Sequence, residues 1–179
     1  VNHNIPDAIG LTIQTPVGLV AHTCDFKIDF QPVADKPADL ARIVQLTSSG
    51  TLLLLSDSTG AETPGHTPSE HIIMKNLEDI FEDAKGRIII ATFASLIERI
   101  QQIIWLAEKL DRKVAVDGFS MRSNVAISRE LGYLKAKKTT LITPEQSLRL
   151  PDDKVVVLCT GAQGEDRAVL MRIINKEHK

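Results

Sequence analysis

Short apolar runs alternate along most of the chain with longer segments in which apolar residues recur every three or four positions. Runs of about four to eight apolar residues are typical of strands in a parallel sheet, and the wider spacing is typical of amphipathic helices. The expected strands cover residues 8–15, 18–23, 51–58, 87–93, 113–118, 139–143 and 154–161. The expected helices cover residues 38–48, 68–84, 95–110, 123–132 and 166–176. This alternation predicts an α/β fold with a parallel sheet and right-handed crossovers.

Two local patterns make sharper predictions. The run TLLLLSDS, residues 51–58, contains four consecutive leucines, so we expect a strand that is buried on both faces. The residues Thr67, Pro68, Ser69 and Glu70 have the spacing of a capping box, with Pro68 at the first helical position. We therefore expect the second helix to begin at Pro68.

Polar loops follow four of the expected strands. In open α/β sheets, ligands bind beyond the carboxyl ends of the strands. The loops at those ends are rich in hydroxyl groups and glycine, and they cover residues 56–59, 92–95, 117–120 and 160–164. Hydroxyl and backbone N–H donors at helix starts suit phosphate oxygens, although the same residues also serve as helix caps. Four such loops at one expected edge favour a phosphate-bearing ligand.

An aspartate, Asp25, follows the stretch VAHTC at the end of an expected strand. A carboxylate at such a junction either forms a turn or binds a ligand, because loop ends on a rigid sheet are where sites are built. The local sequence leaves both interpretations open.

Composition narrows the class of protein. The chain has 179 residues, of which 43% are hydrophobic and 25% are charged, as in an ordinary globular domain. The net charge of −2 gives no bulk attraction for nucleic acid, so any such site must be a local patch. No apolar run approaches the roughly 20 residues that span a bilayer, so no membrane partner is expected. The two cysteines, Cys24 and Cys159, suggest a reducing, cytoplasmic compartment without a disulfide framework.

Common motifs are absent. The chain has neither a GxGxxG fingerprint nor a Walker loop, and no Ser/His/Asp triad is legible. A short basic run at Lys135, Lys137 and Lys138 is typical of a solvated surface loop. The first residue, Val1, suggests a segment cut from a longer protein.

Several stretches together resemble one family. VNHNIPDAIG at 1–10 and HTCDFKIDF at 22–30 are similar to motifs of ribonuclease J, a member of the metallo-β-lactamase superfamily and its β-CASP subgroup. LLLLSDST, ETPGHTPSE, GRIIIATFAS, KVAVDGFSM, ELGYLK and CTGAQGE then match later motifs in the same order. The resemblance covers essentially the whole chain. It implies that residues 1–58 are the C-terminal part of a metallo-β-lactamase half. Residues 59–179 would be an incomplete β-CASP domain, a three-layer, Rossmann-like parallel-sheet fold.

The resemblance also implies a chemistry. The family consists of metal-dependent ribonucleases with endonuclease and 5′-exonuclease activity on single-stranded RNA, which act in mRNA decay and RNA processing and assemble as homo-oligomers. The implied ligands of two Zn²⁺ ions, or of Mn²⁺ or Mg²⁺ in their place, are His3 and a bridging Asp25. The implied catalytic carboxylate is Asp57, which otherwise caps a turn. The implied RNA-binding residues are Ser95, Ser120, Thr160, Gly161 and Gln163.

This segment departs from the family pattern. The main HxHxDH metal motif and the later histidine segments are not among these residues, so we expect the isolated chain to be inactive and to bind metal weakly or not at all. Cys24 stands where glycine is usual, Leu96 and Glu98 replace a polar residue and a histidine, and Phe119 replaces an arginine. Lost cations weaken phosphate contacts, whereas Phe119 could stack on a base. Two alternatives remain open: a non-catalytic RNA-binding module, and a nucleotide-binding α/β domain unrelated to RNA.

Overall fold

The computed structural model describes residues 1–34 and 36–178. Its contacts divide the chain into two compact units, residues 1–73 and 74–179. The domain boundary expected from the sequence, between residues 58 and 59, stays a prediction.

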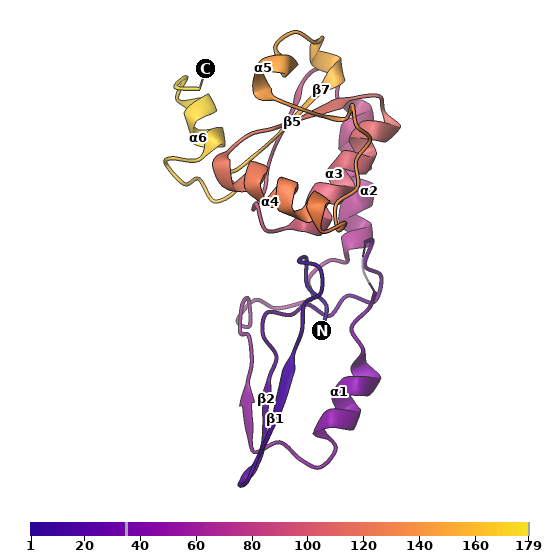
Figure 1. The fold of residues 1–179 in the computed structure, drawn as a ribbon, viewed down its shortest axis with the longest axis vertical. Coiled ribbons are helices and arrows are strands. Elements are labelled where there is room, and N and C mark those ends of the chain that lie inside the picture. The colour runs from indigo at the N-terminus through magenta and orange to yellow at the C-terminus, as the bar shows by residue number, and fades with distance from the viewer. Residues whose placement is uncertain (35, 179) are drawn as a thin grey trace. The chain divides into compact units, whose positions relative to one another are not determined.

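The first unit is built on a three-stranded sheet with the order β1-β2-β3 (Figure 1). Strands β1 (Leu11–Thr15) and β2 (Gly18–His22) form an antiparallel hairpin, in which Leu11 pairs with His22 and Thr15 with Gly18. Strand β3 (Leu53–Leu55) runs parallel to β2. Helix α1 (Leu40–Thr47) lies between β2 and β3 in the chain. The side chain of Asp39 caps this helix by accepting a hydrogen bond of 2.8 Å from the N–H of Arg42.

The expectation for the leucine run was wrong in one respect. The run does form a strand parallel to its neighbour, but Leu52, Leu53, Leu54 and Leu55 are 63%, 48%, 60% and 44% exposed. Within this unit β3 is the last strand of the sheet and pairs on one side only. An unbroken apolar run indicates that a strand can be buried, but the layers that would bury it are a tertiary matter.

The second unit is an α/β layer structure. Its strands are β4 (Ile88–Ala91), β5 (Lys113–Val116), β6 (Leu141–Ile142) and β7 (Val155–Cys159), all parallel, in the order β4-β7-β5-β6. Its helices are α3 (Ile97–Lys109), α4 (Phe119–Glu130), α5 (Pro144–Ser147) and α6 (Val169–Ile174), with a 3-10 turn at Asp152–Lys154. Helix α2 (Glu70–Asp83) crosses the boundary between the two units.

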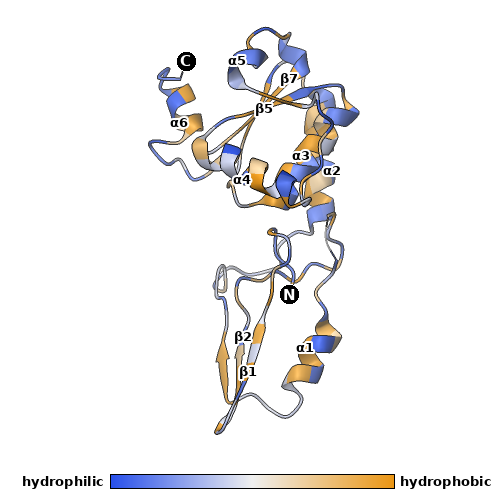
Figure 2. Cartoon of the chain, in the orientation of Figure 1, coloured by the Kyte–Doolittle hydropathy of each residue, from blue (hydrophilic) through white to orange (hydrophobic). Residues whose placement is uncertain are grey.

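One continuous core holds the second unit together. Helix α3 contributes Ile100, Ile103 and Ile104, none of them exposed, and these pack in one cluster with Val156 and Leu158 of the central strand β7. Orange helix faces and strands in Figure 2 mark this apolar material. Burial of an aliphatic side chain of this size stabilises the fold by roughly 1.5–3 kcal/mol.

The α/β class and its parallel sheet are confirmed, with several differences in detail. The helix that follows Ser69 begins at Glu70, two residues later than the capping-box pattern placed it, and α5 and the 3-10 turn were not expected. Strand β7, the last in the chain, inserts between β4 and β5.

No helix in the described part of the chain is both long and apolar enough to cross a membrane.

Candidate functional site

Backbone pairing in the first unit brings the segments of His3 and Asp25 together. The N–H of Lys27 donates a hydrogen bond of 2.7 Å to the carbonyl oxygen of Asn2, as an isolated antiparallel bridge. His3 follows the bridged Asn2, and Asp25 lies two residues before the bridged Lys27. The two predicted metal ligands therefore come from neighbouring segments, although they are 22 positions apart in the sequence.

Asp57 lies beside the same loop. The N–H of Thr23 donates to the carbonyl oxygen of Leu55 at 3.0 Å, and the hydroxyl of Thr23 accepts from the N–H of Asp57 at 3.0 Å. Thr23, two residues before Asp25, thus contacts Asp57, so three segments that carry predicted site residues converge.

The carboxylate of Asp57 is held in its charged form. The N–H and the hydroxyl of Thr59 donate to its Oδ1 at 2.9 and 2.8 Å. These hydrogen bonds, helped by those from Phe26 and Ser58, keep the pKa of Asp57 below its usual value. Asp57 therefore forms a turn with Thr59, as one interpretation of the sequence had it, and at the same time contacts the Asp25 loop.

Cys24 occupies a strained backbone position in this loop. Its φ is 52°, in the left-handed region, and its N–H donates a hydrogen bond of 2.8 Å to Nδ1 of His22. Glycine adopts this conformation without steric cost, whereas a residue with a Cβ does not. The backbone thus explains why glycine is usual at this place in the motif that the stretch resembles.

The described residues do not complete a metal site. Across residues 1–34 and 36–178, no three histidine, cysteine, aspartate or glutamate side chains are grouped so that they could hold one ion. A catalytic zinc usually has three protein ligands and a structural zinc has four. His3 and Asp25 therefore stay predicted ligands, and by themselves they do not fit a metal ion.

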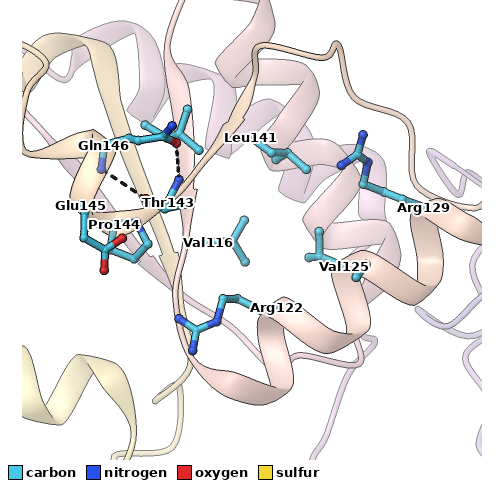
Figure 3. A pocket seen from close by; sticks show the side chains of 11 residues that line it. Val116, Arg122, Val125, Arg129, Leu141, Thr143, Pro144, Glu145 and Gln146 are labelled. Carbon is cyan, nitrogen blue, oxygen red and sulfur yellow. Dashed lines mark hydrogen bonds between the residues drawn. The ribbon is translucent and has the colours of Figure 1, made fainter.

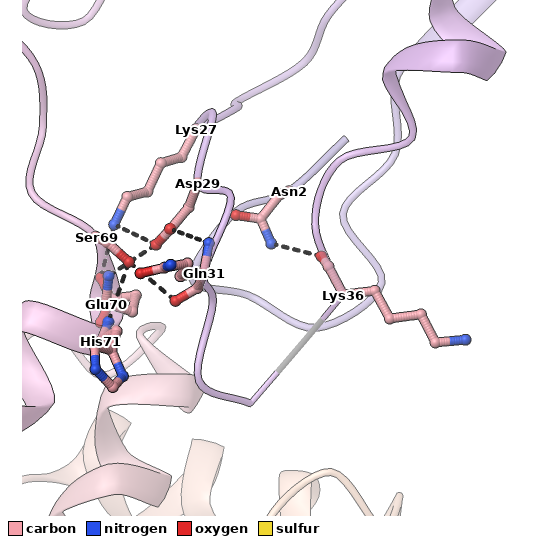
Figure 4. A network of polar contacts seen from close by, with 8 residues as sticks. All are labelled: Asn2, Lys27, Asp29, Gln31, Lys36, Ser69, Glu70 and His71. Atoms are coloured by element: carbon pink, nitrogen blue, oxygen red, sulfur yellow. Dashed lines mark hydrogen bonds and ion pairs between the residues drawn. The ribbon is translucent and has the colours of Figure 1, made fainter.

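A buried ionic network anchors the same loop (Figure 4). Nζ of Lys27 lies 3.0 Å from Oε1 of Glu70 and 3.4 Å from Oδ2 of Asp29, and the two carboxylate side chains are only 2% and 1% exposed. Oδ2 of Asp29 also accepts from the N–H of Glu70 at 2.8 Å, which caps helix α2 from a distance. The network ties the Asp25 segment to the start of this helix.

Hydrogen bonds keep Asp29 charged despite its burial. Burial alone would raise the pKa of Asp29, but donors from Glu70, Ser69 and Gln31 outweigh it and lower the pKa below its usual value. The sequence patterns did not predict this network. The available signal was the spacing of Lys27 and Asp29, because residues two apart in an extended segment share a face.

In the second unit, three of the expected loops meet at one edge of the sheet. The N–H of Thr92 donates to the carbonyl oxygen of Cys159 at 3.0 Å, and the N–H of Asp117 donates to that of Leu158 at 2.9 Å. The loops after β4, β5 and β7 are therefore neighbours. The fourth loop, 56–59, follows β3 in the other sheet, so the expectation that it shares this edge was wrong.

Four of the predicted RNA-binding residues lie in the loops after β4 and β7, and Ser120 lies in the first turn of α4. Ser95, Ser120 and Gln163 are exposed, and Thr160 is half-buried. Gly161 has a structural reason to be glycine: its φ is +121°, and a Cβ there would lie 2.7 Å from the Cβ of Leu170. Packing against the start of α6 therefore accounts for Gly161 without any ligand.

A charged cluster that was not expected closes this edge. Asp117 is buried, and its Oδ1 accepts from the N–H of Gly118 at 2.7 Å and from Nη1 of Arg122 at 3.2 Å. Its Oδ2 lies 2.6 Å from Nε2 of His178. The cluster joins the end of β5 to α4 and to the end of the described chain. No local sequence signal could have paired two residues 61 positions apart.

The second unit is an α/β domain in which three loops meet at the carboxyl ends of the parallel strands. Comparisons with known proteins show which family the chain belongs to. The family model described as "Ribonuclease J, beta-CASP domain" matches residues 85–179. Ribonuclease J of Thermus thermophilus is 48% identical over 176 residues, which are 98% of this chain and 30% of that protein. Ribonuclease J2 of Bacillus subtilis is 40% identical over 177 residues, which are 99% of this chain and 32% of that protein.

A solved structure shares the fold. A crystal structure of a protein of unknown function from Enterococcus faecalis matches 91% of this chain and 40% of that chain, with a TM-score of 0.59 and 16% identity. The chain belongs to the ribonuclease J family, and the resemblance seen in its motifs is confirmed. It spans about a third of the length of the two ribonucleases named above.

Proposed function

We propose that this chain is a segment of a metal-dependent ribonuclease that hydrolyses phosphodiester bonds of single-stranded RNA. Membership in the ribonuclease J family supports the proposal. The observation that carries it for this chain is the hydrogen bond of 3.0 Å from the N–H of Asp57 to the hydroxyl of Thr23, because it joins the loops of two predicted site residues.

Each predicted residue has a role in this proposal. His3 and Asp25 are metal ligands, and Asp57 holds the loop of Asp25 in place, because its N–H donates a hydrogen bond to the hydroxyl of Thr23. Because the described residues do not gather three donors, the chain by itself hydrolyses no RNA, and the remaining ligands come from other parts of a protein as long as its relatives.

The wider biology follows the family. The proposal includes endonuclease and 5′-exonuclease action in mRNA decay and RNA processing, zinc as the metal with manganese or magnesium as alternatives, and a homo-oligomeric full-length protein. It also includes a cytoplasmic location, which the two free cysteines of the described chain support.

A non-catalytic RNA-binding module is the second candidate. Phe119 and Ser120 are the first two residues of α4, and Phe119 is 84% exposed. Ser120 is also exposed, as are Ser95 and Gln163 on loops at the same sheet edge. An exposed aromatic ring beside hydroxyl and amide groups suits the stacking of single-stranded bases.

The test separates the two candidates in the full-length protein. Cleavage of a 5′-phosphorylated single-stranded RNA should fall at least about 100-fold in Asp25→Asn, since a lost metal ligand disables the site. The exposed Asp153→Asn is the matched control and should keep its activity. Unchanged cleavage in Asp25→Asn would rule out the assigned ligand, and RNA binding without cleavage in the native protein would favour the module.

A further inference from the structure

A cavity of about 390 Å³ lies in the second unit between helix α4 and the segment 141–146 (Figure 3). Its floor consists of Val116, Val125 and Leu141, of which the first two are buried. This volume is within the range of about 300–1,000 Å³ typical of small-molecule sites. An apolar floor of this kind suits the face of a flat ring.

Two arginines of α4 border the floor. Arg122 and Arg129 both line the cavity, and Figure 3 shows the three apolar side chains between them. Seven helical positions separate the two residues, which corresponds to about 10 Å along the axis. A small inorganic anion cannot bridge that span and also cover the floor, so the ligand needs an apolar body with an anionic group at one end.

The charges differ at the two ends of the cavity. Arg122 already forms an ion pair with Asp117, and its charge also acts on Glu145. Arg129 is exposed and has no ion pair within the described part of the chain. Arg129 is therefore the cation available to an anion, and an arginine binds phosphate through two parallel hydrogen bonds.

The opposite end offers hydrogen-bond acceptors on a rigid support. Thr143 and Gln146 form a complete capping box, with hydrogen bonds of 2.9 and 3.3 Å, which fixes the short helix α5. The hydroxyl of Thr143 also donates to Glu145 and so lowers the pKa of this carboxyl. An ionised carboxylate only accepts hydrogen bonds, so Glu145 selects a ligand edge that donates them.

We propose that this cavity binds one nucleotide, with its base on Val116, Val125 and Leu141, its phosphate at Arg129 and its amino edge at Glu145. The exocyclic amino groups of adenine and cytosine donate to a carboxylate, whereas uracil presents a carbonyl at that position. The nucleotide is either a free monophosphate or one unit of a single-stranded RNA, because both present the same chemistry. The inference does not depend on the ribonuclease activity proposed above.

The first experiment titrates adenosine monophosphate and uridine monophosphate into the 179-residue chain by calorimetry. Adenosine monophosphate should bind more tightly. In Arg129→Gln its affinity should fall about tenfold, as expected when a charged hydrogen-bond pair of roughly 1.5 kcal/mol is lost. The matched control is Arg172→Gln on α6, an exposed arginine outside the cavity, which should bind as the native chain does.

The second experiment tests base selection. Glu145→Gln should reduce the preference for adenosine over uridine monophosphate, since an amide both donates and accepts. Glu130→Gln, at the exposed end of α4, should leave the preference unchanged. All four positions are exposed, so thermal unfolding should show that each variant remains folded.

A third experiment distinguishes a free nucleotide from one unit of an RNA strand. If the cavity takes a unit of an RNA strand, oligoadenylate should bind more tightly than the monophosphate, and Arg129→Gln should reduce the salt slope by about 0.7. If it takes a free nucleotide, the two should bind alike. The proposal is overturned if neither ligand binds, or if Arg129→Gln and Arg172→Gln bind equally. Cleavage by the full-length protein would be unaffected by that failure.

Discussion

At the residue scale, the backbone conformation of Cys24 destabilises the folded chain at its candidate metal loop. The left-handed φ of 52° costs a residue with a Cβ roughly 1 kcal/mol relative to glycine. Cys24→Gly should therefore raise the free energy of unfolding by about that amount, as measured by urea denaturation. Cys24→Ala, which keeps the Cβ, should show no such gain. Equal effects of the two variants would mean that the thiol, and not the backbone, sets the stability.

The two cysteines should differ in reactivity. Cys159 is fully buried, and its burial, followed by the negative charge of Asp117, raises the pKa of its thiol to about 11. Since the thiolate is the reactive form, maleimide at pH 8 should label the native chain once, at the partly exposed Cys24. Mass spectrometry after labelling in urea should show two additions. Native Cys24→Gly should show none, and a label on Cys159 would contradict the buried position.

At the element scale, one ammonium group holds the start of helix α2. Lys27→Met leaves the buried carboxylates of Asp29 and Glu70 without their cation, which should cost about 3–5 kcal/mol of stability. The N–H of Glu70 donates a hydrogen bond to Asp29, so its hydrogen exchange should become faster as the network is destabilised. Lys75→Met on the same helix is exposed and should change stability by less than about 0.5 kcal/mol. An equal effect of both variants would show that the network contributes nothing specific.

The same network should make stability depend on pH. The pKa of Asp29 is lower in the folded chain than in the unfolded one. The stability that the ionised Asp29 contributes is therefore fully present above its unfolded-state pKa of about 3.9. This stability is lost as the pH falls through the folded-state pKa. The stability difference between the native chain and Asp29→Asn should shrink as the pH falls below about 4. Urea unfolding at pH 3 to 7 measures this, and a constant difference would contradict the assignment.

At the scale of the whole molecule, the first unit exposes much apolar surface. Leu52–Leu55, Leu11 and Ile13 are all exposed on one small sheet, and exposed apolar patches of this kind promote association. We expect the chain to self-associate with rising concentration in sedimentation velocity. Leu54→Lys should reduce this association, whereas Leu148→Lys, at a comparably exposed leucine of the second unit, should not.

Local patterns predicted the elements of both units well, for a physical reason. Helix and strand periods reflect side-chain directions along a single element, so α3 and β7 could be located from their own residues. Boundaries were less accurate where a distant residue supplies the cap, as Asp29 does for α2. The loops after β4, β5 and β7 were expected to share an edge, and pairing of parallel strands places them there.

The sequence by itself determined the α/β class, the order of the strands and of the longer helices, the family, and the loops that carry His3, Asp25 and Asp57. Tertiary structure decided that β3 joins a separate sheet, that β7 lies between β4 and β5, and that Asp117 meets His178. It also decided that the half-buried Lys27 pairs with two buried carboxylates and that Arg129 borders a cavity. The reason is that hydrophobic periodicity specifies which face of an element is buried, whereas the partner that buries it depends on strand pairing and packing between distant residues.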